Sequence, residues 1–258
     1  MSGFFNSSVL ISILLFLGML LLDLAGFRVR LNRNKKNITE THTGLGSAEG
    51  ALLGLLSLLL AFTFNLSASR YDARRQTLID EANNIGTAIL RTQLYPDSVR
   101  NSLKTDFKEY VEARINYYET GNDEEKTRAA LNHSMLVSQR IWNTVAALSQ
   151  KPENVFRSQQ MVPALNNMID ITTTRDDKRV AYVPNSILNL LFILCLASAF
   201  IIGYGRKEKK VDWILLLGFT TMISITVYLI LDLDHARTGI ITMDKAHLKI
   251  LELRNMFK

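Results

Sequence analysis

Few side chains in this 258-residue chain have the types and spacing that catalysis or metal binding requires. The four histidines are too scattered for a metal-ligand pattern, and the single cysteine has no disulfide partner within the chain. No Gly-x-Ser-x-Gly motif occurs, and no glycine-rich loop follows a strand. We therefore expect no enzyme: no catalytic residues, no metal and no cofactor. The residues considered are His42, His133, His235, His247 and Cys195.

Ionisable side chains inside apolar segments are the stronger lead to function. Glu49 lies about one turn inside the segment 45–68, and Asp23 lies at a similar depth near the end of the first apolar segment. A charge in lipid costs ~2.5–3.5 kcal/mol on insertion scales, so such residues usually face a helix bundle or water. Either these carboxylates face an interior, or they reach the headgroups or pair with Arg28 or Arg30.

Uncharged polar residues form rows in two apolar segments. Thr63 and Asn65 lie near the end of the second segment, and Thr220 and Ser224 share one face of the fourth with Tyr228. Such rows can hydrate a pore, but hydrogen bonds between helices, worth ~0.6–2 kcal/mol, explain them equally well. Asn65 has the highest free-energy cost of transfer into lipid among them, which favours a functional role for this residue.

Charges of opposite sign leave the second and fourth segments on one side of the membrane. They form either a surface salt-bridge network or an electrostatic vestibule for ions. The candidate pore or vestibule residues are therefore Glu49, Thr63, Asn65, Arg70, Arg74, Arg75, Thr220, Ser224, Asp232 and Asp234.

Four segments have the length and apolarity of a membrane span. At ~1.5 Å rise per residue each can cross a hydrocarbon core of ~30 Å. The predicted spans are about Val9–Phe27, 45–68, Ile187–Tyr204 and Trp213–Leu231.

The second span carries glycine at every fourth position. Gly46, Gly50 and Gly54 fall on one face of a helix and leave it without side chains. Because burying leucine against leucine gains nothing in lipid, a bare stripe is best explained as a surface for close helix packing. We predict that these glycines form a helix-packing seam.

The residues between the second and third spans predict a soluble helical domain. No proline occurs between residues 44 and 95, so the second span should continue as one long helix, followed by helices over about 98–119, 124–149 and 153–172. The third of these four should bury Leu131, Met135, Ile141, Val145 and Leu148. The fold class is all-α: an integral membrane protein with four transmembrane helices and a soluble helical bundle between spans two and three.

The domain boundaries follow from this pattern. Residues 1–69 contain spans one and two with the basic loop 28–43. Residues 70–183 form the soluble domain. Residues 184–232 hold spans three and four with the basic loop 205–212, and 233–258 form a C-terminal tail.

The net charge of +6 is concentrated in the two short loops. They carry nine Lys and Arg against three acids, whereas residues 70–183 carry 16 against 15. This distribution argues against nucleic acid as a partner and indicates contact with membrane lipid. Short basic loops prefer the cytoplasm, which predicts an extracytoplasmic soluble domain.

Four stretches of the chain resemble a known family. They are GALLGLLSLLLAFTF (50–64), SRYDARR (69–75), EANNIGTAILR (81–91) and LDLDHARTG (231–239). They are similar to the signature of the bacterial bestrophin-like membrane family, domain of unknown function 4239. That family usually has a proline step in the last stretch, where this chain has His235 and Ala236.

The resemblance implies kinship with bestrophins, which are pentameric anion channels. They also have four spans and a large helical domain between the second and third, but theirs is cytosolic and their second span carries an aromatic-proline neck. This chain has no proline there. The resemblance also implies a multi-pass protein of the bacterial plasma (inner) membrane.

Two functions remain open. The first is a homo-oligomeric, bestrophin-like ion channel or pore, with an inorganic ion, anionic by analogy, as its cargo. The second is a membrane-embedded sensor or scaffold whose helical domain binds a partner or signal.

Overall fold

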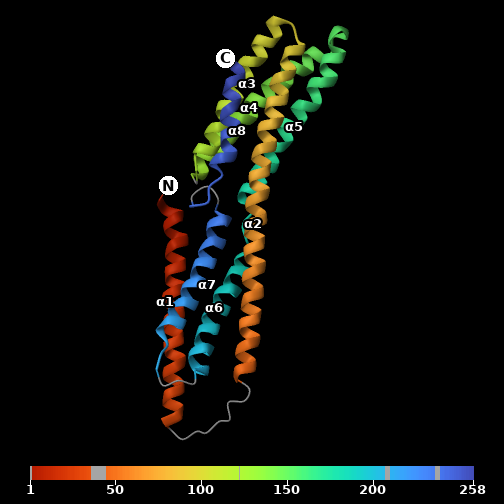
Figure 1. Cartoon of the computed structure of the whole chain (residues 1–258). Coiled ribbons are helices and arrows are strands. Elements are labelled where there is room, and N and C mark those ends of the chain that lie inside the picture. The colour runs from red at the N-terminus through yellow and green to blue at the C-terminus, as the bar shows by residue number, and fades with distance from the viewer. Residues whose placement is uncertain (1, 36–44, 122, 207–209, 236–238) are drawn as a thin grey trace. The chain divides into compact units, whose positions relative to one another are not determined.

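The computed structural model describes residues 2–35, 45–121, 123–206, 210–235 and 239–258. Within these residues every regular element is helical, which confirms the all-α prediction (Figure 1). The α-helices are α1 (Ser2–Lys35), α2 (Leu45–Arg91), α3 (Asp97–Glu119), α4 (Glu124–Ser149), α5 (Val155–Val180), α6 (Asn185–Gly205), α7 (Trp213–Asp234) and α8 (Asp244–Glu252).

Four helical segments are long and apolar enough to cross a membrane, as predicted. They are Ser7–Arg33, Gly46–Leu94, Pro152–Gly205 and Trp213–Asp234, and the apolar part of the third is α6. The basic loops are only partly described, because residues 36–44 and 207–209 lie outside the described residues.

The chain divides into two compact units. The bundle unit comprises Tyr71–Ala181 with Ala236–Lys258, and the span unit comprises Ser2–Arg70 with Tyr182–His235. Helix α2 contributes to both, because it runs for 47 residues without a break. The absence of proline from this stretch permits it, since each residue can then donate its backbone hydrogen bond.

The bundle unit is built on amphipathic helices. The predicted apolar register of α2, namely Leu78, Ala82, Ile85 and Ile89, is fully buried. It packs against buried residues of α3, α4 and α5 in one continuous hydrophobic core. Local signals set the helix ends: Pro96 precedes α3, and the Asp123 carboxylate accepts a hydrogen bond from the backbone nitrogen of Lys126 at the start of α4.

Helix α4 has a different inward face from the predicted one. Ile141 and Val145 are buried as expected, but Met135 is 56 % exposed, and Ser134 and Ser138 face inward instead. The prediction was wrong here because it assumed an apolar face. Ser134 faces inward because its hydroxyl accepts a hydrogen bond from the buried Arg114 side chain at 3.3 Å.

Helix α5 is longer than predicted, ending at Val180 rather than near Thr172. The prediction ended it where the charged residues Arg175, Asp176 and Arg179 begin. Those residues continue the helix because their side chains find partners within the bundle unit.

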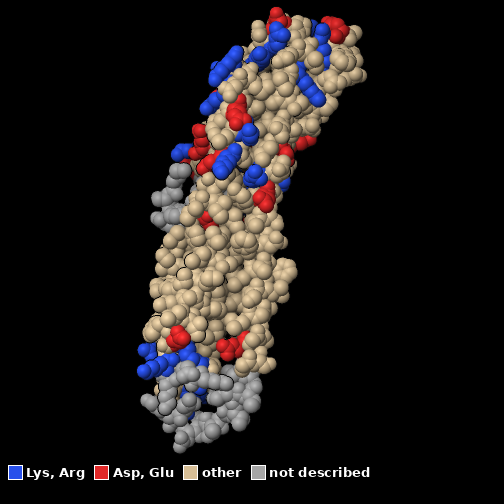
Figure 2. Space-filling view, viewed as in Figure 1, with Lys and Arg blue, Asp and Glu red and all other residues tan. Residues whose placement is uncertain are grey.

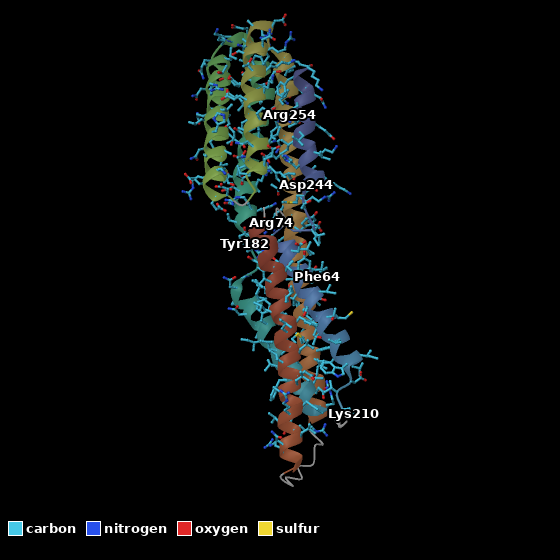
Figure 3. The ribbon with its side chains drawn as sticks, turned by 90° about the vertical axis from the view of Figure 1, so that its left-hand side faces the viewer. Phe64, Arg74, Tyr182, Lys210, Asp244 and Arg254 are labelled. Atoms are coloured by element: carbon cyan, nitrogen blue, oxygen red, sulfur yellow. The ribbon has the colours of Figure 1, made fainter. Side chains whose placement is uncertain are left out.

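The C-terminal residues contain a helix that belongs to the bundle core. Ala246 and Ile250 of α8 and Leu253 after it are buried in the same hydrophobic cluster as α2 and α3. The Arg254 guanidinium, labelled in Figure 3, donates to both carboxylate oxygens of Glu112 at 2.8 and 2.6 Å. The segment that the sequence analysis set apart as a tail is thus a structural part of this unit.

In the span unit, α1 packs backbone to backbone against α6. A Cβ atom at Gly203 would lie 1.9 Å from the Asp23 carbonyl oxygen, and one at Gly26 would lie 2.2 Å from the Phe200 carbonyl oxygen. Because real Cβ contacts never come so close, only glycine fits at either position. These two glycines, rather than Gly46, Gly50 and Gly54, form the close helix contact within one chain.

The outer surface of the span unit is apolar. Figure 2 shows few charged side chains over the middle of its visible face, where α1, α2, α6 and α7 lie. Large apolar side chains are exposed on all four of these helices, among them Leu21, Phe62, Ile193 and Ile214. Such a surface is stable in contact with lipid and unstable in water.

Adding a single methyl group at Gly203 should break the span unit. We expect Gly203→Ala to destabilise the detergent-solubilised protein by about 1–3 kcal/mol or more, because the overlapping atom is backbone and cannot move aside. The readout is the thermal unfolding midpoint by circular dichroism. Gly218→Ala is the matched control, since a Cβ at position 218 meets nothing within 4 Å. Equal stability of the two variants would contradict the contact.

Candidate functional site on the second span

The glycine stripe of α2 lies open on the surface of the single chain. Gly46, Gly50 and Gly54 are exposed, and among the described residues no atom lies within 4 Å of a Cβ built on any of them. None of the described helices therefore packs on this stripe. The predicted seam has no partner helix among them.

The open face extends beyond the glycines. Ser57, Ala61 and Asn65 continue it at intervals of three and four residues, and all three are exposed. The face therefore begins with bare backbone, continues through small side chains and ends at an amide. In the most apolar 18 residues of each helix, 17 % are buried in α2, against 28 % in α1 and 39 % in α7. Of these three spans, the second is therefore the least covered by the other described residues.

Two predicted residues on α2 face the other spans instead. Thr63 is buried, and its hydroxyl donates a hydrogen bond to the Leu59 carbonyl oxygen. Glu49 is half-buried beside α6, where its Oε2 atom lies 2.9 Å from the position of a Cβ at Gly205. Both side chains thus point away from the open face that carries Gly50 and Asn65.

The polar row of α7 lies inside the span unit. Thr220 and Ser224 are buried, and the Thr220 hydroxyl donates to the Leu216 carbonyl oxygen at 2.7 Å. This bond satisfies the hydroxyl within its own helix. A threonine of this kind can sit in an apolar interior at little cost.

The acidic residues at the ends of the spans are buried and engaged. The Asp234 carboxylate accepts a hydrogen bond from the backbone nitrogen of Val183, with its two oxygens at 3.1 and 3.0 Å, while Asp232 accepts from the Tyr228 hydroxyl. At the other end of the unit Asp23, only 1 % exposed, accepts two bonds from Arg206 at 2.9 and 3.0 Å. The sequence analysis named Arg28 or Arg30 as a partner in one of its alternatives. Arg206 takes that place because Gly203 brings α6 against the backbone of Asp23.

The three arginines that follow the second span have different environments. Arg75 is exposed, Arg70 is half-buried, and Arg74 is buried. The Arg74 guanidinium donates to the carbonyl oxygens of Lys178 and Ala181 at 3.0 and 2.5 Å, at the C-terminus of α5. A cation there satisfies carbonyls that the helix leaves free and complements its dipole, so Arg74 holds two helices together.

A buried ionic network in the bundle unit was missed by sequence reasoning. Glu81 of α2 and Arg114 of α3 are fully buried, and Arg175 of α5 is almost so. The Glu81 carboxylate accepts from Arg114 Nε at 2.5 Å through one oxygen and from Arg175 Nη1 through the other. Arg114 Nη1 also donates to the Ser134 hydroxyl at 3.3 Å.

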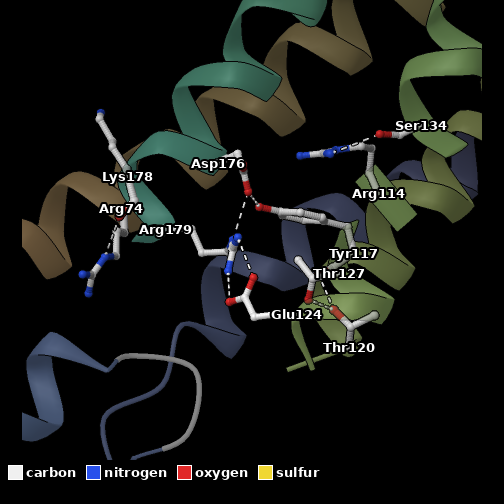
Figure 4. A network of polar contacts seen from close by, with 10 residues as sticks. All are labelled: Arg74, Arg114, Tyr117, Thr120, Glu124, Thr127, Ser134, Asp176, Lys178 and Arg179. Carbon is white, nitrogen blue, oxygen red and sulfur yellow. Dashed lines mark hydrogen bonds and ion pairs between the residues drawn. The ribbon is translucent and has the colours of Figure 1, made fainter. Parts of the chain in front are cut away.

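The network continues toward the surface of the bundle (Figure 4). The Tyr117 hydroxyl donates to Asp176 at 2.6 Å, and Asp176 also accepts from Arg179, which pairs with Glu124. Burial by itself would raise the pKa of the Glu81 carboxyl. The two guanidiniums outweigh this effect and hold its pKa below the usual range.

A signal for this network was present in the sequence. Glu81 lies three residues after Leu78 and four before Ile85, on the apolar face of α2, and Arg114 likewise falls between Tyr110 and Tyr117. A charged residue in an apolar register marks a buried ion pair. The identity of its partner cannot be read from the register, because it comes from another helix.

Comparison with known proteins assigns the chain to a family. The profile of the family described as Bestrophin-like domain matches residues 10–248. The chain belongs to the bestrophin-like family.

Solved structures share this bestrophin-like fold. A crystal structure described as a membrane protein has a TM-score of 0.69 at 11 % identity, covering 95 % of this chain and 98 % of its own. A variant of a bacterial bestrophin homologue from Klebsiella pneumoniae has a TM-score of 0.68 at 10 % identity, covering 95 % and 100 %. A second variant of that homologue has a TM-score of 0.66 at 11 % identity, covering 94 % and 98 %. No curated protein is significantly similar to the chain.

Glu81 should make the stability of the bundle pH-dependent. Its pKa is lower in the folded than in the unfolded state, so the stabilisation is complete above about pH 5, where an unfolded glutamate is ionised, and is lost as the pH falls. Glu81→Gln should cost about 3–5 kcal/mol at pH 7, because two buried arginines lose their counter-charge.

The measurement is the unfolding midpoint between pH 7 and pH 4. The variant should show a flatter profile than the parent chain. Glu112→Gln is the control, because its pair with Arg254 is exposed and worth at most about 1 kcal/mol. Glutamine at position 81 that left both the midpoint and the profile unchanged would exclude the ionic role.

Proposed function

We propose that the chain is one subunit of a homo-oligomeric ion channel of the bacterial inner membrane. In this assembly the open face of α2 meets the equivalent helix of a neighbouring subunit, and Asn65 borders the ion path. The proposed preference for anions follows from the kinship of the family with bestrophins.

One observation carries this proposal: the stripe of small residues on α2 is exposed on the apolar surface of the span unit. A lipid-facing helix needs no such stripe, because acyl chains pack equally well on leucine. Helices that approach each other closely do need it, since small residues let the two backbones meet. Gly50, Gly54, Ser57 and Ala61 supply that surface, and no other described helix of the chain occupies it.

We further propose that the bundle unit is the water-exposed domain of the subunit. It would correspond to the soluble domain predicted at residues 70–183, with the C-terminal segment added. Its surface carries charges of both signs, several of which are paired across helices, such as Arg140 with Asp106. Figure 2 shows these charges spread over the bundle unit, in contrast to the middle of the span unit. Such a surface requires water around it.

Assembly and conduction test the proposal together. Gly54→Leu should shift the purified protein from oligomer to monomer, because a large side chain fills the seam. The measurement is the mass of the detergent complex by light scattering. Gly218→Leu is the matched control: this glycine of α7 is also open within the chain, and no seam is proposed there.

Charge at position 65 should change ion selectivity in planar bilayers. Asn65→Lys and Asn65→Asp should shift the reversal potential in opposite directions. Lysine should raise the permeability to anions relative to cations, and aspartate should lower it. Bilayers that show no conductance in any salt would overturn the proposal that the protein is a channel.

A sensor or scaffold is the alternative that the unbroken helix α2 favours. It contributes to both units, so a one-turn displacement could pass along it. Silent bilayers together with one stoichiometric partner in pull-down would support this function instead.

For orientation, we propose that the short basic loops face the cytoplasm and the bundle unit faces outward. The support is the charge of these loops, to which Arg28, Arg30, Arg33 and Arg206 contribute. Ser102 of α3 is exposed and suits a probe. Ser102→Cys in a Cys195→Ala background should react with a membrane-impermeant maleimide on intact cells. Reaction only after lysis would reverse the orientation.

A further inference from the structure

One end of the span unit carries an excess of positive charge. It is the end at which α1 and α6 terminate and α7 begins, and Figure 2 shows Lys and Arg side chains gathered there, beyond the apolar face. Residues 23–49 and 205–212, which connect the helix ends found there, contain nine Lys and Arg against five Asp and Glu. The carboxylates of these segments therefore leave four positive charges unbalanced.

Contacts between α1 and α6 bring several of these cations together. The Arg206 guanidinium carbon lies 5.7 Å from the centre of the Phe27 ring, and Arg30 follows Phe27 by three residues on the same face of α1. The Arg33 Nη1 atom donates to the Tyr204 hydroxyl at 2.7 Å, two residues before Arg206. The ends of the two helices thus hold three guanidiniums close together.

Two more cations at this end are exposed. They are Arg28 of α1 and Lys210, which precedes α7 and is labelled in Figure 3, and no described residue forms an ion pair or hydrogen bond with either side chain. The Asp212 carboxylate accepts hydrogen bonds from two backbone nitrogens at the start of α7. Because every acid of the two segments is already included in the charge balance, the surplus is available to a ligand from outside the chain.

The cations lie at the edge of the lipid-suited surface. Val29, between Arg28 and Arg30, is exposed, and so are Trp213 and Ile214 at the start of α7. An exposed tryptophan at the end of a span is typical of the headgroup level of a membrane. Arginine and lysine beside such residues keep their stems on apolar surface and extend their charged ends to the phosphate layer.

We propose that the basic cluster at this end binds the phosphate group of an anionic phospholipid. The cluster consists of Arg28, Arg30, Arg33, Arg206 and Lys210. Guanidinium groups suit this ligand, because each can donate two parallel hydrogen bonds to phosphate oxygens.

A lipid matches this end of the unit better than a free phosphate ion does. Its acyl chains cover exposed side chains such as Val29 and Ile214 while its phosphate meets the cluster, whereas the ion supplies only the second contact. A zwitterionic lipid brings a positive charge of its own and leaves the excess unbalanced. The site belongs to the span unit of one chain and does not depend on the channel function.

The first experiment follows the unfolding midpoint of the full-length protein in detergent while lipid is added. Phosphatidylglycerol should raise the midpoint along a saturable curve, and phosphatidylcholine with the same acyl chains should raise it much less. Arg28→Gln combined with Lys210→Gln should increase the half-saturating concentration of phosphatidylglycerol about tenfold or more, since each cation near a lipid surface contributes about 1 kcal/mol. Arg128→Gln combined with Lys108→Gln is the matched control, because these exposed cations lie in the bundle unit, and it should leave the curve unchanged.

The second experiment counts bound lipid on the parent protein by native mass spectrometry, so it requires no variant to fold. The protein should retain phosphatidylglycerol in preference to phosphatidylcholine from an equal mixture. Equal retention of both lipids, or an equal rise of the midpoint with inorganic phosphate alone, would overturn the proposal. The monomeric variant Gly54→Leu should keep the preference, which separates this site from the proposed assembly and conduction.

Discussion

The close contact between the backbones of α1 and α6 is the constraint on which the span unit depends. In lipid, apolar side chains gain little from meeting each other, so helices associate where packing and polar pairing are good. Gly26 and Gly203 supply the packing, and the pair of Asp23 with Arg206 supplies the polar contact at the same crossing. The glycines and the ion pair act together, because the short distance between backbones is what brings the arginine to the carboxylate.

A different constraint organises the bundle unit, where buried apolar side chains form most of the core. Here the unusual feature is a carboxylate and two guanidiniums placed where apolar side chains would be expected. Such groups contribute less to stability than a well-packed apolar core of equal volume, but their geometry admits few alternatives. Glu81, Arg114, Arg175 and Ser134 come from four helices and are hydrogen-bonded to one another in one arrangement. The exposed Met135 and the extension of α5 to Val180 both follow from this requirement.

The open face of α2 unites the fold with the proposed function. The same helix that supplies Ile85 and Glu81 to the bundle presents Gly50, Gly54 and Asn65 outward in the span unit. The proposed function assigns this uncovered face to a contact with a neighbouring subunit. The bestrophin-like family, matched over residues 10–248, is compatible with this arrangement.

The sequence by itself determined the elements and their class. Composition and periodicity act over neighbouring residues, so the four spans, the unbroken α2 and most apolar registers could be read directly. The family could be read too, since its signature is local. What only the tertiary structure decided is which groups meet: Asp23 with Arg206, Gly203 with the backbone of Asp23, and Glu81 with Arg114 and Arg175. These partners are distant in sequence, and nothing in a local pattern encodes the crossing of two helices. For the same reason the glycine stripe at 46, 50 and 54 was visible in the sequence, but only the fold revealed that the other described helices leave it open.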